Sequence, residues 1–509
     1  MTLTSGLSIA VGGLSNVNRQ LALLAHNVSN ASTPGYVREV SVQISVTADG
    51  AGMGVQSGPA LRDVDTALRD GLWSQVSTMA DLETRRTALA GIDALLGAPG
   101  AGQDLASLTG QVRDAFSRLA TDPSDQSGQR AVVSAAITLT VSIHALSTAY
   151  TMQRQTAHDS ARSDIDTINR ALAEVGSLND RIIRLKSTGE SIADLENLRD
   201  AAIRKISELI DLKALPQANG DMLLVTPRGM MLPTRGTADP FSLAESAMQP
   251  ASWYPGGGVP GIMLGGVDVT AQFVSGRLGA NIALRDAILP KNQAALDEFA
   301  QILSQRLDAQ GLALFTDPAG NVPSGGGSPT QTGYVGYASV IQVNANIAAD
   351  ASLVRDGTHA IAGSPTGASA FIPNPMTGPA GFNQLIQRML DFAFGTEMQQ
   401  GVAQSPFNTA GLGPGGTLAI PVIAASVTII GVAQSLVATQ AAESADVTAR
   451  TEAEKAVQDA LQSRYDARTG VNIDAEMATM VQLQNAYGAN ARVISALQTM
   501  WDQLLAAVR

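Results

Sequence analysis

The chain has 509 residues, enough for two to four domains, and 15% of them are charged and 4% aromatic. Its interior must therefore be built mainly from Ala, Leu, Val and Ile, and long stretches lack a charged, solvated face. A net charge of −12 without a basic cluster argues against nucleic acid as a partner, and the lack of cysteine excludes thiol catalysis, disulfides and thiolate metal sites.

The first segment predicts a helix whose apolar residues recur at intervals of four and three from Leu3 to Val28. This spacing places them on one seam, as in a coiled coil. Arg19 is the single charged side chain of the helix, and its three glycines each weaken it by roughly 1 kcal/mol relative to alanine. The helix therefore needs a partner. Its predicted seam residues are Leu7, Leu14, Val17, Leu21, Leu24 and Val28.

A turn follows this helix, because Pro34 forces the residue before it out of the helical region. Alternating apolar residues from Val40 to Val46 then predict a half-buried strand, and 50–58 a loop or hairpin. Long antiparallel helices with short turns come next and predict an elongated bundle. The predicted helices cover 64–96, 105–119, 129–186 and 195–212.

Glycine and proline become frequent after Pro216, where short apolar runs suggest strands. Helical spacing returns over 277–310, with a kink near Pro290, and again over 382–394 and 418–468.

The stretch 417–442 within the last of these helices is apolar and uncharged, as a membrane span would be. It contains Pro421, Gly431 and several hydroxyl and amide side chains, and lacks flanking basic residues. We interpret it as a buried helix of an assembly and expect no membrane insertion.

The last segment predicts a helix that mirrors the first. Asn472, Asp474 and Glu476 suit its beginning, as a cap and as acidic residues of the first turn. One seam position is polar, which in coiled coils fixes the register. The predicted seam residues are Met480, Leu483, Tyr487, Asn490, Ile494, Leu497, Trp501 and Leu504.

The two end helices can pair and leave their outer faces to neighbouring subunits; alternatively, both are core helices of a monomer. We therefore expect a mainly α fold with paired, coiled-coil-like terminal helices, an elongated helical bundle and an inserted small, mostly β domain. The predicted division assigns 1–45 and 471–509 to the terminal helices, 46–213, 277–312 and 382–470 to the bundle, and 214–276 and 313–381 to the inserted domain.

Residues suited to catalysis are sparse. No two of the four histidines have the spacing of metal ligands. Two G-x-G-x-x-G patterns, over 256–261 and 411–416, contain proline and do not join a clear strand to a helix, so we interpret them as loops. We expect no catalytic residue, no cofactor and no metal, and thus no enzyme.

Both chain ends carry the motifs of a known family. Residues 26–36 resemble the N-terminal signature of the flagellar rod, hook and hook-associated proteins, and 470–477 with 484–494 resemble their C-terminal signature. Asp194–Asp200 and Leu289–Ala300 resemble mid-chain motifs of the hook-associated members. One departure is glutamate at position 39, where the family usually has glutamine.

The resemblance implies a structural subunit of the bacterial flagellum at the junction between hook and filament. It implies extracellular location after export by the flagellar type III apparatus without signal cleavage. The implied partners are like subunits in a ring, the hook protein, the second junction protein, and a dedicated export chaperone at the C-terminal region.

Two alternatives stay open at this point. One is another axial protein, such as a hook or filament subunit. The other is an extracellular adhesin or hydrolase carried on assembly-competent ends, which would need a pocket of convergent carboxylates or histidines in the inserted domain.

Overall fold

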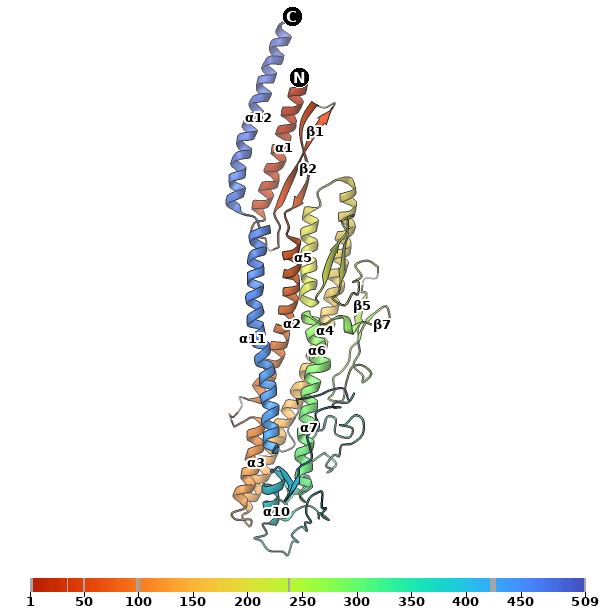
Figure 1. The fold of residues 1–509 in the computed structure, drawn as a ribbon, viewed down its shortest axis with the longest axis vertical. Coiled ribbons are helices and arrows are strands. Elements are labelled where there is room, and N and C mark those ends of the chain that lie inside the picture. The colour runs from red at the N-terminus through yellow and green to blue at the C-terminus, as the bar shows by residue number, and fades with distance from the viewer. Residues whose placement is uncertain are drawn as a thin grey trace. The chain divides into compact units, whose positions relative to one another are not determined.

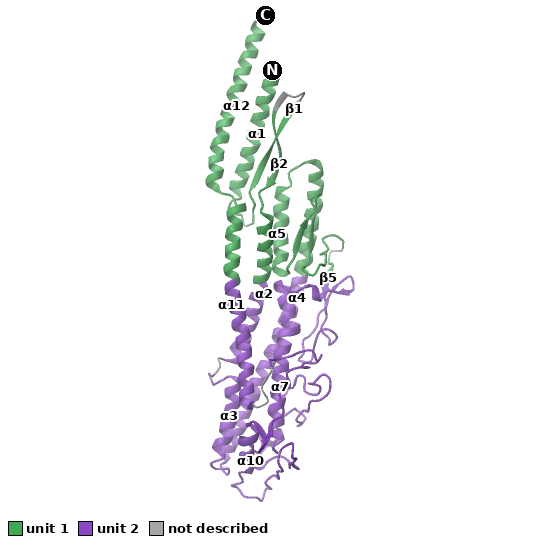
Figure 2. Cartoon of the chain, viewed as in Figure 1, with its two compact units in different colours: residues 1–79, 166–240, 454–509 green, residues 80–165, 241–453 purple. Residues whose placement is uncertain are grey.

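The computed structural model describes residues 3–33, 35–48, 51–97, 100, 102–236, 239–421 and 427–507, and is predominantly helical with small antiparallel sheets (Figure 1). Pro34 of the predicted turn and part of the apolar stretch 417–442 lie outside the described residues. The chain forms two compact units (Figure 2): residues 1–79, 166–240 and 454–509 make unit 1, and residues 80–165 and 241–453 make unit 2.

Unit 1 contains the two ends of the chain, whose helices lie side by side with a hairpin next to the first of them (Figure 1). The hairpin begins with the pair Glu39–Arg62 and confirms the predicted strand, but the predicted half-burial is wrong at Ile44 and Val46, which are 54% and 38% exposed. The elements of unit 1 are α1 (Leu3–Ser29), β1 (Glu39–Ala48), β2 (Ala51–Arg62), α5 (Ala193–Leu209), β3 (Lys213–Pro216), β4 (Met222–Val225) and α12 (Ile473–Ala507). Three long helices contribute to both units: α2 (Thr66–Leu96), α4 (Gln126–Thr188) and α11 (Ile429–Thr469).

Unit 2 is organised around a core in which Phe116, Ile143 and Phe299 are fully buried. Its main helices are α3 (Leu105–Leu119), α6 (Gly276–Ala283), α7 (Leu289–Asp308) and α10 (Gln384–Arg388), with short helices α8 (Ala345–Ala349) and α9 (Leu353–Asp356). Its strands are β5 (Phe241–Leu243), β6 (Ile262–Leu264), β7 (Val267–Asp268), β8 (Phe315–Thr316), β9 (Gln342–Val343), β10 (Glu397–Gln399) and β11 (Val402–Ala403).

The kink predicted near Pro290 is a π-helical turn over 284–288, between α6 and α7. Pro290 follows this turn closely, and because proline has no N–H it cannot donate the next backbone hydrogen bond of the helix. The helix predicted over 382–394 is α10 followed by a second π-helical turn. The helix predicted from 418 begins instead at Ile429.

The glycine-rich segments form few strand residues, since the strands between 214 and 381 have two to four residues each. Side chains of α7 hydrogen-bond to several groups of these loops. The buried carboxylate of Asp297 accepts hydrogen bonds from the backbone N–H groups of Gly336 and Ala338, at 2.8 and 2.9 Å. Glu298 accepts one from the Tyr334 hydroxyl at 2.5 Å. Loops can therefore be ordered here without a sheet.

One helix among the described residues, α4, is long and apolar enough over an 18-residue window to cross a membrane. Of that window, 44% is buried inside the protein, and core helices of soluble proteins pass the same test.

Candidate assembly site

The predicted seam residues of α1 line one side of the helix but differ in burial. Val17 and Leu24 are buried, Leu14, Leu21 and Val28 are half-buried, and Leu7 is 38% exposed. On α12, Met480, Leu483, Asn490, Ile494 and Leu497 are half-buried, whereas Tyr487, Trp501 and Leu504 are exposed. Burial thus decreases toward the C-terminal end of α12.

Glycines set how closely α1 and α12 approach. A Cβ atom at Gly6 would lie 3.7 Å from the Leu497 methyl groups, and one at Gly13 would lie 3.1 Å from Asn490 Oδ1. The face of α1 toward α12 is therefore shifted from the predicted seam toward these glycines. From the sequence alone, these glycines were predicted only to lower the stability of the helix. Gly6 and Gly13 are seven residues apart and lie on the same side of the helix as buried Ala10 and Val17. This spacing could have placed the glycines at the contact with α12.

Gly12 and Gly13 form a matched pair for testing this contact. A Cβ at Gly12 would meet nothing within 4 Å, so Gly12→Ala should stabilise α1 by up to about 1 kcal/mol. Gly13→Ala should give a smaller gain or a loss, because its methyl group crowds Asn490. Circular dichroism and hydrogen exchange of α1 in the full chain measure the difference. Equal gains in both variants would contradict the close approach at Gly13.

A second side of α1 faces the hairpin. The Ser57 hydroxyl donates a hydrogen bond to Asn16 Oδ1, and a Cβ at Gly54 would lie 3.8 Å from Ile9. The helix is thus held between α12 and the hairpin, which leaves part of its circumference free.

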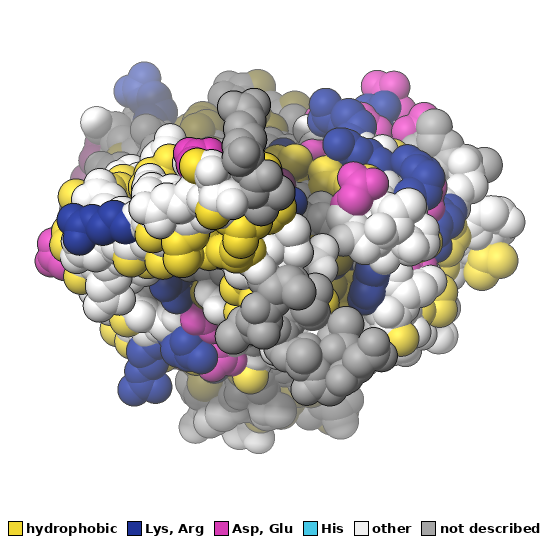
Figure 3. Space-filling model, turned by 90° about the horizontal axis from the view of Figure 1, so that it is seen from above, with side chains coloured by type: hydrophobic (Ala, Val, Ile, Leu, Met, Phe, Trp, Pro, Cys, Tyr) yellow, Lys and Arg dark blue, Asp and Glu magenta, His cyan; other side chains and the backbone are white. Residues whose placement is uncertain are grey.

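Large apolar side chains remain exposed on these elements. Figure 3 shows hydrophobic side chains at the surface seen from above, with Lys, Arg, Asp and Glu side chains among and around them. Single exposed apolar residues are ordinary, but a concentration of them marks an interaction surface. The exposed residues of α12 include Val481, Tyr487, Val493, Met500, Trp501, Leu504 and Leu505, each at least 41% exposed, and those of the hairpin include Ile44, Val46, Val55 and Leu61.

The segment that follows the N-terminal signature meets the beginning of α12. Arg38 Nε lies 2.5 Å from Glu476 Oε1, and the carboxylate of Glu476 is almost fully buried. The backbone N–H of Arg38 also donates to the carbonyl of Thr469, at 2.9 Å. This contact fixes the beginning of α12 against the segment that follows α1. From the sequence, Glu476 was predicted only as an acidic residue of the first helical turn, and its contact with Arg38 was not predicted.

Asn27 gives the N-terminal signature its conformation. Its side chain donates to the Glu39 carbonyl at 2.9 Å and accepts from the Glu39 N–H at 3.0 Å, as a strand neighbour would. The Tyr36 hydroxyl donates to the same Asn27 oxygen at 2.9 Å and lies 3.2 Å from His26 Nδ1. Burial, followed by the charge of Glu39, raises the pKa of this hydroxyl.

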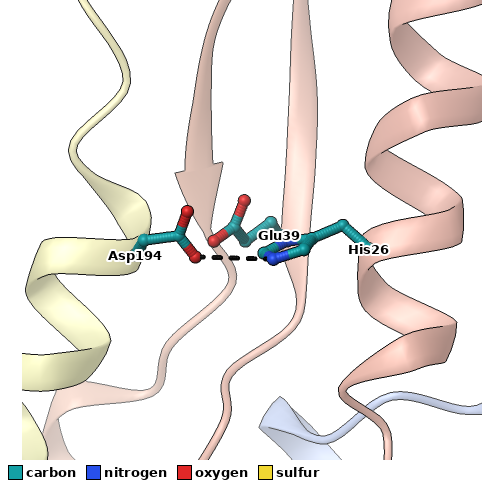
Figure 4. A group of neighbouring side chains, drawn as sticks. All are labelled: His26, Glu39 and Asp194. Carbon is teal, nitrogen blue, oxygen red and sulfur yellow. Dashed lines mark ion pairs between the residues drawn. The ribbon is translucent and has the colours of Figure 1, made fainter.

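Three ionisable side chains from separate elements converge beside this turn (Figure 4): His26 of α1, Glu39 of β1 and Asp194 of α5. Their possible ligand atoms lie within 4.8 Å of one another, and His26 Nε2 is 3.8 Å from Asp194 Oδ1. Burial and then the charge of Asp194 raise the pKa of Glu39 to about 7, against the opposite effect of His26 and Arg62. No local pattern indicates this cluster, because Asp194 lies 155 positions after Glu39 in the chain.

Comparisons with known proteins address the same regions. Residues 89–320 match the family of the flagellar hook-associated protein FlgK helical domain, and residues 462–507 match the flagellar basal body rod FlgEFG protein C-terminal family. Flagellar hook-associated protein 1 of Escherichia coli is 21% identical over 62% of this chain, and that of Bacillus subtilis is 24% identical over 44%.

This chain is a relative of flagellar hook-associated protein 1. The matched parts span 58% and 46% of the length of the Escherichia coli and Bacillus subtilis relatives. The flagellar hook junction protein FlgK from Burkholderia pseudomallei has a similar fold, with a TM-score of 0.54 over 78% of this chain and 99% of that one, at 14% identity. The family is a structural one, and the mainly α fold with paired terminal helices agrees with the expectation from sequence.

Proposed function

We propose that the chain is a structural subunit of the bacterial flagellum that forms the junction between hook and filament by polymerising through its terminal helices. The observation that carries this proposal is the pairing of α1 with α12, joined at Arg38 and Glu476, with apolar side chains left exposed on both α12 and the hairpin. Such surfaces, nearly free of charge, suit contact with like surfaces of neighbouring copies.

The finer parts of this proposal follow from the family. Like subunits would form a ring that contacts the hook protein and the second junction protein, with the chain outside the cell after export without signal cleavage. A dedicated chaperone would cover the C-terminal region before export, which agrees with the exposed apolar side chains of α12. The proposed role is structural and involves no catalysis.

A deletion strain tests the junction role. We expect hooks without filaments in electron micrographs, together with filament subunits released into the medium, because these are still made and exported but find no junction. Reintroducing the wild-type gene should restore filaments.

The same strain separates the alternatives. Missing hooks would identify a hook subunit, and a medium without filament subunits would identify the filament subunit itself. Normal filaments would contradict any essential axial role and favour a displayed adhesin or hydrolase.

A further inference from the structure

The Glu39 carboxyl group has an unusual environment for a buried acid. The residue is 4% exposed, and Oε1 has no hydrogen-bond donor among the described residues. A buried carboxylate is costly unless donors or counter-charges offset its burial, and the charges of His26 and Arg62 only partly offset the burial of Glu39 and the charge of Asp194. Figure 4 shows this group directed at His26 and Asp194. Asp194 is itself an acid, so the cluster calls for a positive charge between its members.

The hydrogen bonds of the His26 ring determine which ring nitrogen carries the proton and which one offers a lone pair toward Asp194. The Tyr36 hydroxyl gives its proton to Asn27 Oδ1, at 2.9 Å. Toward His26 Nδ1, at 3.2 Å, the hydroxyl oxygen therefore acts as acceptor, which assigns the ring proton to Nδ1. In neutral imidazole Nε2 then carries a lone pair, and this atom faces Asp194. A lone pair opposite a carboxylate is unfavourable unless a proton or a metal cation lies between the two atoms.

The three side chains are held in place from outside the cluster. Asn27 fixes the backbone of Glu39 by two hydrogen bonds, and Tyr36 fixes the His26 ring, as the outer partner of a metal-binding histidine does. Asp194 is anchored in the first turn of α5. The side chains of His26 and Asp194 are 40% and 70% exposed, so a cation could enter from solvent while Glu39 forms the floor.

We propose that His26, Glu39 and Asp194 bind a divalent transition-metal cation of the Zn²⁺ type. One imidazole nitrogen and two carboxylates are a ligand set that suits Zn²⁺ and its neighbours better than Ca²⁺ or Mg²⁺, which prefer oxygen ligands alone. The cation would join α1, β1 and α5 through their side chains and so strengthen the attachment of the N-terminal helix. The spacing of the histidines predicts no metal site, whereas the proposed site combines one histidine with two carboxylates from other elements.

Zinc titration of the full-length chain, after removal of metals with a chelator, tests the site. We expect calorimetry to show one zinc ion bound per chain, and the melting temperature to rise on adding zinc. Glu39→Gln and His26→Gln should each weaken binding by at least about tenfold, and Tyr36→Phe by about 10- to 100-fold through loss of the ring's outer partner. Cobalt added alone should give a visible absorption band that is lost in the same variants.

His359→Gln is the matched control, because His359 Nε2 also lies near a carboxylate, 3.5 Å from Asp308 Oδ1, in unit 2. This variant should bind zinc like the wild type. Far-ultraviolet circular dichroism confirms that each variant keeps its helices. Zinc binding that is undetectable, or that is unchanged in Glu39→Gln and His26→Gln, would overturn the proposal and leave a proton as the occupant. Calcium binding equal to zinc binding would overturn it as well.

Discussion

Replacing Leu497 with aspartate should abolish polymerisation while unit 2 stays folded. Leu497 is half-buried, and its methyl groups lie over Gly6 at the shared face of α1 and α12. A carboxylate there would lose solvent without gaining a counter-charge, at a cost of several kcal/mol. The pairing of two partly exposed helices offers little surplus against the entropy of ordering them. We expect the variant to lose the pairing of α1 with α12, and filaments and motility to be lost as a consequence.

Three measurements follow this variant. Assembly is followed by electron microscopy, α1 by hydrogen exchange, and the core of unit 2 by its thermal unfolding, which should be almost unchanged because Leu497 belongs to unit 1. Gln498→Asp places the same charge on the neighbouring exposed position and should keep α1 protected. Wild-type assembly of Leu497→Asp would disprove the helix pairing. Unfolding of unit 2 in Leu497→Asp would show that α12 is a core helix of the monomer.

Replacing Arg62 with methionine should destabilise unit 1 by about 1.5–3 kcal/mol, the usual cost of losing a charged hydrogen bond, because Asp200 and Glu196 then keep only their longer contacts with Arg69 at 3.4 Å and Arg199 at 3.5 Å. Its side chain is 4% exposed and donates to Asp200 at 2.8 Å and to Glu196 at 3.2 Å. Burial lowers the pKa of Arg62, but these two carboxylates more than offset it and raise the pKa overall. Because Arg62 ends β2 and both acids lie on α5, the variant also loosens the hairpin.

Trp73, buried in unit 1, can report this loss during urea unfolding once Trp253 and Trp501 are replaced with phenylalanine. The control is Lys205→Met, which removes an exposed pair with Glu174 at 3.8 Å and should cost less than about 1 kcal/mol. A similar small effect for both variants would show that Arg62 is dispensable. Adding Asp200→Leu to Arg62→Met should recover part of the loss, since the buried carboxylate that lost its nearest partner is then removed, while Arg69 keeps its contact with Asp70 at 2.9 Å.

Helix positions were predictable from the sequence because they depend on local signals. The seam spacing predicted the helices α1 and α12. Asn472 accepts the expected capping hydrogen bond from the Ala475 N–H at 3.1 Å. Pro290 marked the break in the long helix of unit 2. The strand over 40–46 followed from alternation alone. The glycine-rich segments were harder, because their order comes from acceptors on α7, such as Asp297, that no local pattern reveals.

The sequence by itself determined that this protein is mainly helical and that its low-charge end helices pair. Periodicity and turn chemistry act within a few residues, so they can be read along the chain. Tertiary structure alone decided the face on which α1 meets α12, the contact between Arg38 and Glu476, and the convergence of His26, Glu39 and Asp194. These contacts join residues from about 13 to more than 400 positions apart. Which of them meet depends on how whole elements pack, where burial and charge act through space rather than along the sequence.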